Sequence, residues 1–364
     1  MEPYERILKS VRHQLPDRIP IDYLATPEAH NNLKNHLNIG DDETLLRRLG
    51  VDIRRVAGKF IGPKDLCGEP GVSATGKDFW GVGWKPQGYG LGTYNEMAFH
   101  PLAEAKSVKE IKEYAWPKLD WFDFSHLKEE ISRINKDIRY AIMFFAGGAF
   151  ETPWYLRGLE RFLLDLVECP EIAETISSYV ADFYLKRALR AIEESDGKID
   201  IIGSGGDIGT QKGMMLSPGL WRRHIKPYST RLIRTFKDMG LMTFYHSCGG
   251  IRPVVNDFIE MGLDILDPIQ PKASGMDPEE LKTEFGKSLT FHGGIDVQEL
   301  LPFGKPENIK KEVKRLMEIL GSGGGYIVCP AHAIQPDTPA ENILALYETA
   351  KNYATQGFGQ CLSP

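Results

Sequence analysis

The sequence predicts a closed (β/α)8 barrel, because eight short apolar segments alternate with helix-like segments along the chain. Apolar residues make up 42% of the 364 residues, enough for one large core. No Gly-x-Gly-x-x-Gly motif opens a helix after the first segment, which disfavours the alternative, an open doubly wound sheet. The expected strands cover residues 17–23, 51–56, 140–146, 199–203, 242–248, 264–268, 288–292 and 325–329.

Helical periodicity and start signals define the segments between these strands. Ser217 followed by Pro218 is typical of a helix start, since serine caps the free amides and proline suits the first turn. Gly50 and Gly240 are typical stops. Helices are expected at about 3–14, 27–37, 43–50, 154–168, 170–195, 217–240, 278–285, 306–320 and 340–353, with another ending near Gly262.

Residues 61–105 interrupt this rhythm with many glycines and six aromatic residues. Segments 79–86 and 90–100 are expected to pair as a β-hairpin. The insertion either packs on the barrel or forms a lid over a pocket, and the sequence leaves both open. We therefore expect one barrel domain over residues 1–364, with this insertion and a frayed tail from 354 that makes Cys361 incidental. The aromatic residues are Phe79, Trp80, Trp84, Tyr89, Tyr94 and Phe99.

Charge and cysteine content exclude several classes of protein. The net charge is −6 and no Lys/Arg-rich run occurs, which argues against a nucleic-acid partner. No uncharged apolar run reaches membrane length, and the first residues lack a signal-peptide pattern, so we expect a cytoplasmic protein without a membrane partner. Five cysteines in a long chain are no disulfide framework, which leaves thiols free for metal.

The most distinctive polar pattern is His-x-Cys, with a second cysteine much later. His246 and Cys248 end one expected strand, and residues two apart in a strand point to the same side. Cys329 ends the last expected strand, before Pro330. One imidazole and two thiolates with an open fourth position are typical of a catalytic zinc site, although a cysteine at a strand end is also a common buried apolar residue.

Other polar residues also follow expected strands, on the barrel face where active sites lie. A lone histidine such as His292 is more often hydrogen-bonded than a ligand, so each residue also has a purely structural interpretation. The strand-end residues, besides the three thiol and imidazole ligands, are Asp22, Tyr23, Gly147, Gly148, Glu151, Asp207, Asp267, Gln270, His292, Asp296 and His332.

Several longer motifs resemble the uroporphyrinogen decarboxylase superfamily over nearly the whole chain. The segment from His332 to Asn342 is the most specific, and the segment from Tyr155 to Gly158 is similar to the helix after the third strand. The resemblance implies a (β/α)8 barrel, in agreement with the strand count. Further matching segments are 206–209, 216–218, 226–228, 248–250, 292–296 and 306–309.

Two chemistries occur in this superfamily. Its decarboxylases carry an Arg-Gln-Ala-Gly-Arg segment after the first strand, whose arginines suit an acidic tetrapyrrole. The corresponding residues 21–27 contain no arginine and contain Asp22. The corrinoid-linked methyltransferases instead carry a signature similar to His246, Cys248 and Cys329. The decarboxylase and a non-catalytic zinc- or corrinoid-binding relative remain the alternatives.

The resemblance to the methyltransferase branch implies a function. It implies one zinc per chain on His246, Cys248 and Cys329, and methyl transfer between a corrinoid and a small thiol or methylated substrate, in a direction that the sequence does not fix. The chain lacks the Asp-x-His-x-x-Gly segment common in cobalamin carriers, so we expect the corrinoid on a separate partner protein. Asp207 and His332 are the candidate catalytic residues. The candidate substrate-binding residues are Asp22, Tyr23, Glu151, Tyr155, Gln270 and His292.

Overall fold

A parallel seven-stranded sheet forms the centre of the molecule. The computed structural model describes residues 1–70, 76–88 and 93–353. Along the sheet the strand order is β1-β7-β8-β11-β12-β13-β14. The strands are β1 (Ile53–Val56), β7 (Ala141–Gly148), β8 (Ile201–Gly205), β11 (Met242–His246), β12 (Ile265–Ile269), β13 (Thr290–Ile295) and β14 (Tyr326–Pro330).

The segment around Ile21 closes this sheet into a barrel. Ile21 forms a parallel bridge with Val328 of β14. On its other side, its carbonyl oxygen accepts a hydrogen bond of 2.8 Å from the amide of Asp52, just before β1. This segment therefore takes the place of the eighth strand, between β14 and β1. The predicted (β/α)8 fold is confirmed.

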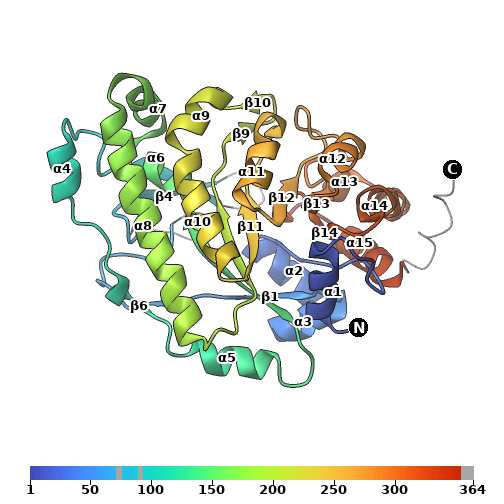
Figure 1. Cartoon of the computed structure of the whole chain (residues 1–364). Coiled ribbons are helices and arrows are strands. Elements are labelled where there is room, and N and C mark those ends of the chain that lie inside the picture. Colours follow the sequence, from blue (N-terminus) through green and yellow to red (C-terminus); the bar gives the residue numbers. More distant parts are fainter. Residues whose placement is uncertain (71–75, 89–92, 354–364) are drawn as a thin grey trace.

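Helices surround the barrel, and Figure 1 shows α8, α10 and α11 side by side along one flank. Thr26, Asp41 and Ser217 cap α2, α3 and α9 through their side-chain oxygens. The helices are α1 (Pro3–Val11), α2 (Pro27–Leu37), α3 (Asp42–Leu49), α4 (Val108–Glu113), α5 (Leu127–Ile134), α6 (Glu151–Arg157), α7 (Leu159–Glu168), α8 (Pro170–Glu194), α9 (Pro218–His224), α10 (Lys226–Asp238), α11 (Val255–Met261), α12 (Pro278–Phe285), α13 (Leu300–Phe303), α14 (Pro306–Gly321) and α15 (Ala340–Asn352), with short 3-10 turns η1 (Leu119–Trp121) and η2 (Arg252–Val254).

Two helices differ from the sequence-based expectation. The helix expected over 217–240 is broken into α9 and α10, where Pro227 in the first turn of α10 has no amide hydrogen to continue the ladder. The helix expected from 154 starts earlier, as α6 at Glu151, and breaks at Gly158, whose φ of 84° suits glycine. The earlier start places Glu151 in a first helical turn that opens directly from β7.

The insertion contains a small antiparallel sheet that packs on the barrel. Its strands are β3 (Gly76–Lys77), β4 (Gly83–Gly88) and β5 (Thr93–Phe99). Trp80 is fully buried, and its indole Nε1 donates to the Tyr184 hydroxyl of α8 at 3.1 Å. Tyr89 lies outside the described residues. Two further pairs are β2 (Lys59–Phe60) with β6 (Phe122–Asp123), and β9 (Gly209–Thr210) with β10 (Gly213–Met214).

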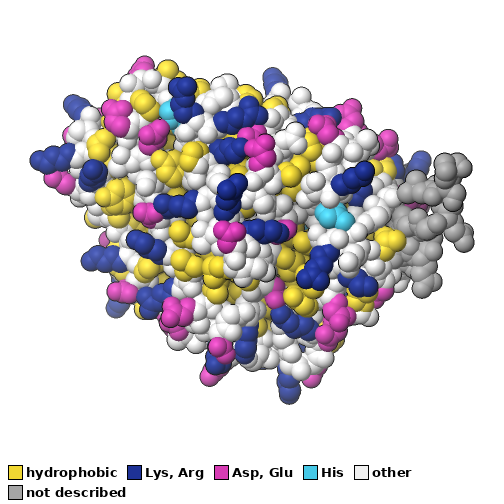
Figure 2. Space-filling view, viewed as in Figure 1, with side chains coloured by type: hydrophobic (Ala, Val, Ile, Leu, Met, Phe, Trp, Pro, Cys, Tyr) yellow, Lys and Arg dark blue, Asp and Glu magenta, His cyan; other side chains and the backbone are white. Residues whose placement is uncertain are grey.

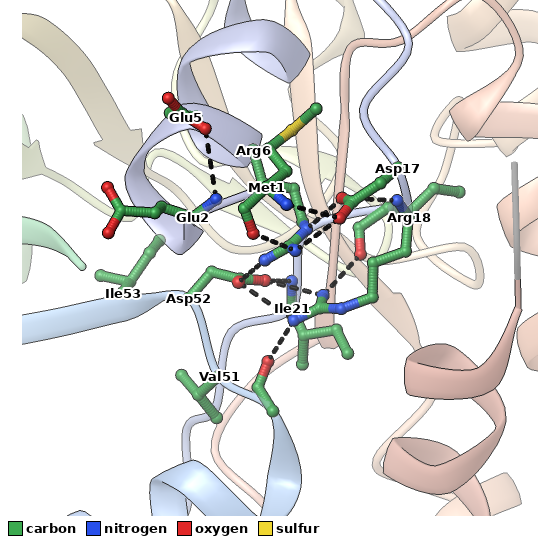
Figure 3. Close-up of polar contacts among 12 residues, drawn as sticks. Met1, Glu2, Glu5, Arg6, Asp17, Arg18, Ile21, Val51, Asp52 and Ile53 are labelled. Atoms are coloured by element: carbon green, nitrogen blue, oxygen red, sulfur yellow. Dashed lines mark hydrogen bonds and ion pairs between the residues drawn. The ribbon is translucent and has the colours of Figure 1, made fainter. Parts of the chain in front are cut away.

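A buried ion-pair network closes the amino-terminal end of the barrel (Figure 3). Asp52 is fully buried, and its carboxylate accepts hydrogen bonds from Arg6 at 2.6 Å and from Arg18 at 2.8 Å. Asp17, which is 43% exposed, holds Arg6 from the other side at 2.7 Å. Ile7 of α1 is buried in the barrel interior next to this network. This end of the barrel is therefore structural, and the opposite mouth is left for a site.

The surface carries both signs of charge. On the face drawn in Figure 2, Lys and Arg side chains alternate with Asp and Glu rather than gathering in one region. Among the described residues, no helix combines the length and the apolar character needed to cross a membrane.

Candidate active site

The carboxyl ends of the strands bring most of the predicted polar residues into one cluster. His246 ends β11, and its backbone pairs with Gly205 of β8 on one side and with Asp267 of β12 on the other. On β14, Cys329 pairs with Gly294 of β13. The parallel register thus aligns imidazole, carboxylate and thiol groups at one level of the barrel mouth.

Asp267 lies at the centre of this cluster. One carboxylate oxygen is 2.5 Å from Nδ1 of His246 and the other is 2.5 Å from Nδ1 of His292. Burial alone would raise the pKa of Asp267, but the two imidazoles outweigh burial and lower it. In the same way, burial opposes the charge on His246, while Asp267 raises its pKa well above the usual value. The cluster therefore depends on paired charges.

His292 continues the network toward Asp22. Its Nε2 is 3.0 Å from a carboxylate oxygen of Asp22, which also accepts two hydrogen bonds from Arg55, at 2.9 and 2.5 Å. Both ring nitrogens of His292 therefore face carboxylates, and the buried ring bridges Asp22 and Asp267. A chain of alternating charge runs from Arg55 through Asp22, His292 and Asp267 to His246.

His246 and Cys248 are arranged as ligands of one metal ion. Nε2 of His246 and Sγ of Cys248 lie 3.6 Å apart. Two ligands of a tetrahedral zinc, with Zn–N and Zn–S bonds of about 2.0 and 2.3 Å, are separated by about 3.5 Å. The Nδ1 hydrogen bond to Asp267 directs Nε2 toward Cys248, a typical arrangement around metal-binding histidines. Soft donors, separation and orientation therefore all fit zinc.

The third ligand position has two candidates. Among the described residues, the ligand atoms of His246, Cys248 and His332 lie within 4.8 Å of one another, and those of Asp22, His292 and Cys329 form a second such set. Cys329 is fully buried, and burial raises the pKa of its thiol to about 11 against the opposing effect of His292. The structure thus joins His246 to Cys248 and places Cys329 in the adjoining set.

The other predicted residues lie around this centre, except for one. Asp207 accepts the amide of Cys248 at 2.8 Å, and Gln270 accepts the amide of Gly249 at 2.9 Å. Glu151 accepts the Tyr155 hydroxyl at 3.3 Å, and burial together with the nearby Asp207 raises the Glu151 pKa to about 7. Tyr23 does not join the cluster, since its ring packs against Tyr347 and His30.

A cavity of about 440 Å³ opens beside the cluster, between β7, α6 and α8. Glu151 and Tyr155 form part of its wall, and their role in substrate binding stays a prediction. Arg55 and Phe145 also line it, and neither residue was named among the strand-end residues predicted from the sequence. The position of Arg55 near the carboxyl end of an expected strand was an available signal, whereas Phe145 gave none. The wall consists of Arg55, Val56, Ala57, Glu69, Pro70, Phe145, Ala146, Gly147, Gly148, Glu151, Thr152, Tyr155, Tyr184 and Arg187.

A closed barrel with this polar cluster at its strand ends defines an α/β-barrel enzyme. The uroporphyrinogen decarboxylase (URO-D) family profile matches residues 92–353, and the chain belongs to that family. The resemblance inferred from its motifs is therefore confirmed.

Individual relatives include both chemistries of the family. A uroporphyrinogen decarboxylase of Thermus thermophilus is 29% identical over 143 residues, and a methylcobamide:CoM methyltransferase of Methanosarcina barkeri is 28% identical over 139 residues. Each match spans only 38% of the relative's length. A methyltransferase from Methanosarcina mazei superposes with a TM-score of 0.70 at 18% identity, over 96% of this chain and 98% of the other, which shows the same fold.

Proposed function

We propose that this protein is a zinc-dependent methyltransferase that moves a methyl group between a corrinoid on a separate carrier protein and a small thiol or methylated substrate. The observation that carries the proposal is the unit of Asp267, His246 and Cys248, with its zinc-like ligand separation of 3.6 Å. The similarity to a methylcobamide:CoM methyltransferase supports the same chemistry.

In this proposal, His246, Cys248 and Cys329 hold the zinc, with His332 as the alternative third ligand. Zinc in such a site would lower the pKa of a bound thiol or polarise a methylated substrate. Asp267 fixes the tautomer of His246, and Asp207 fixes the backbone of Cys248 through its amide. Gln270 holds the following loop by accepting the Gly249 amide. These contacts keep the metal ligands rigid while the cavity beside them takes the substrate.

Uroporphyrinogen decarboxylase activity is the second candidate, because several relatives carry that name. An acidic tetrapyrrole needs several free guanidinium groups. Arg55 does lie at the barrel mouth, but its guanidinium group already donates two hydrogen bonds to Asp22. Residues 21–27 contain no arginine. The cluster therefore fits thiol and methyl chemistry better.

Metal analysis tests the zinc site directly. The purified protein should bind about one zinc per chain, and Cys248→Ala should lose it while circular dichroism stays unchanged. Comparing Cys329→Ala with His332→Ala decides the third ligand, since only the variant that lacks a true ligand should lose metal. Full zinc retention in Cys248→Ala would refute the site.

A further inference from the structure

A groove of about 670 Å³ lies along the outer side of β1, apart from the cavity at the barrel mouth. Arg54 points outward from this strand, because its neighbour Ile53 packs in the barrel interior. The helix after a barrel strand normally covers that strand, but β1 leads into the insertion, and α2, α3 and α5 line the groove beside it. Among the described residues, the groove shares only Arg55 with the wall of the mouth cavity. The groove is therefore a second place of a size that suits a small molecule.

One carboxylate serves two guanidinium groups in this groove. Arg54 donates two hydrogen bonds to Glu43, at 2.7 and 3.1 Å, and its guanidinium carbon lies 3.8 Å from the centre of the Tyr140 ring. Arg47 donates to the same carboxylate through Nε alone, at 2.6 Å. The terminal amino groups of Arg47 donate no hydrogen bond to any described residue. This wall therefore carries an excess of positive charge and unused donors.

Arg133 of α5 adds a second unused guanidinium group. It is exposed, it lines the groove, and it forms no ion pair or hydrogen bond within the described part of the chain. The remaining charged groups of the groove each face a partner, and these pairs are Asp42 with Lys34, Arg55 with Asp22, and Glu130 with His126. Two guanidinium groups with unused donors favour an anion, and their fork of donors suits a carboxylate.

A buried hydroxyl group in the same groove also lacks a partner. Tyr23 lines the groove and is only 7% exposed, and its hydroxyl oxygen forms no hydrogen bond with any described residue. Burial, and then the carboxylate of Asp42, raise the pKa of Tyr23, so its hydroxyl stays protonated and can donate. Buried polar groups are normally hydrogen-bonded, and an acceptor oxygen of a ligand would satisfy this one.

The polar groups of the groove lie at different depths, with apolar side chains in the same wall. Arg47 is 42% exposed and Arg133 is exposed, whereas Tyr23 is buried. Leu46 and Ile134 are half-buried and supply apolar contacts. A matching ligand has a charged group near the solvent, an apolar body and a second oxygen deeper in the groove.

We propose that this groove binds a small carboxylate that has an apolar body and a second acceptor oxygen at its far end. The carboxylate accepts hydrogen bonds from Arg47 and Arg133, and the second oxygen accepts one from Tyr23. Tyr23, which the sequence suggested as a substrate contact, thereby serves this second site. The inference does not depend on the proposed methyl transfer, because the ligand occupies a different wall of the barrel.

Calorimetry with three probes of similar size tests the site without turnover or a carrier protein. The zinc-loaded protein should bind 4-oxopentanoate saturably, pentanoate more weakly, and the uncharged 2-pentanone not at all. Arg133→Gln should weaken the binding of 4-oxopentanoate about tenfold, since it removes a charged hydrogen-bond donor. Arg133 is exposed, so circular dichroism and thermal unfolding of the variant should match the wild type.

Two control variants locate the bound probe. Arg223→Gln removes an exposed arginine of α9 that also lacks a described partner but lies outside the groove. Glu69→Gln changes the wall of the mouth cavity instead. Both variants should bind 4-oxopentanoate within about twofold of the wild type, because neither residue lines the groove.

Tyr23→Phe tests the hydroxyl group separately from the shape of the ring. The variant should bind 4-oxopentanoate about fivefold more weakly and pentanoate within about twofold of the wild type, because only the first probe has an oxygen for the hydroxyl. A merely structural role of Tyr23 would change the affinity for both probes equally, and that result would refute the contact with the second oxygen.

The site itself would be overturned by any of three results. The first is no saturable binding of 4-oxopentanoate, and the second is equal binding to the wild type and to Arg133→Gln. The third is a loss in Glu69→Gln as large as that in Arg133→Gln, which would place the probe in the mouth cavity. All three results would leave the proposed methyltransferase function intact.

Discussion

Nδ1 of His246 lies 2.5 Å from a carboxylate oxygen of Asp267. The contact fixes which imidazole nitrogen points at Cys248, and it adds negative charge behind the ring. Both effects strengthen a histidine as a metal ligand. Since Asp267 holds His292 equally closely through its other oxygen, one carboxylate orients both histidines of the cluster.

Asp267→Asn should therefore weaken zinc binding by about 10- to 100-fold, the usual effect of losing such a carboxylate. Zinc competition with a chromogenic chelator measures the change. Asp264→Asn is a suitable control, because Asp264 precedes the same strand at the opposite end and contacts Thr243 instead. Equal zinc affinity in Asp267→Asn and the wild type would show that the contact does not support a metal ligand.

The ion-pair network at the other end of the barrel should affect stability and not zinc binding. Asp52→Asn leaves Arg6 and Arg18 without their buried partner, and we expect a loss of about 3–5 kcal/mol in the free energy of unfolding. Asp17→Asn removes a partner that is 43% exposed and should cost about 1 kcal/mol or less. Urea unfolding measures the free energy of unfolding of both variants. Similar small losses would show that Asp52 contributes no more to stability than the exposed Asp17.

Glu151 should make stability depend on pH. Its pKa rises from an ordinary 4.5 to about 7 in the folded protein, so the folded state binds more protons than the unfolded state between these values. Its stabilising contribution is complete below about pH 4.5 and is lost as pH rises to about 7, by at most about 1.4 kcal/mol per pH unit. Relative to Glu151→Gln, the wild type should lose thermal stability as pH rises through this window, which thermal unfolding measures. Parallel curves for the two proteins would contradict the shift.

The segment at residues 21–27 predicts that the protein lacks uroporphyrinogen decarboxylase activity. With no arginine in residues 21–27 and Arg55 held by Asp22, uroporphyrinogen should not be decarboxylated. Incubation under reducing conditions and chromatography of the porphyrins measures this. Formation of coproporphyrinogen above a protein-free blank would restore the decarboxylase as the function.

Strand positions could be predicted closely from the sequence, because each strand is a short apolar run bounded by glycine, proline or charge. The run ending at Cys329 is an example, with β14 only one residue displaced from expectation. The predicted helix boundaries were wrong where a single residue interrupts a helix, as at Gly158 and Pro227. The frayed tail and Cys361 fall outside the described residues, and the single-domain assignment remains a prediction.

The candidate site was predictable only in part. A strand-end position indicates that a side chain faces the mouth, so His246, Cys248 and His292 were found. It does not indicate which neighbours pair, and for that reason the link that Asp267 makes between two histidines could not be predicted. Phe145 gave no signal, since an apolar residue in an apolar strand looks buried, whereas its ring is 44% exposed and lies against glycines 203 and 205 of another strand.

Methyl transfer itself is the most direct test of the central claim. The zinc-loaded protein is mixed with a corrinoid carrier in its methyl-cobalt(III) form and a thiol, or in its cobalt(I) form and a methylated substrate, and the cobalt spectrum is followed. We predict a change of methylation state in one direction that depends on zinc and falls at least 100-fold in Cys248→Ala. The same spectrum with and without the protein, in both directions and with full zinc occupancy, would contradict the account.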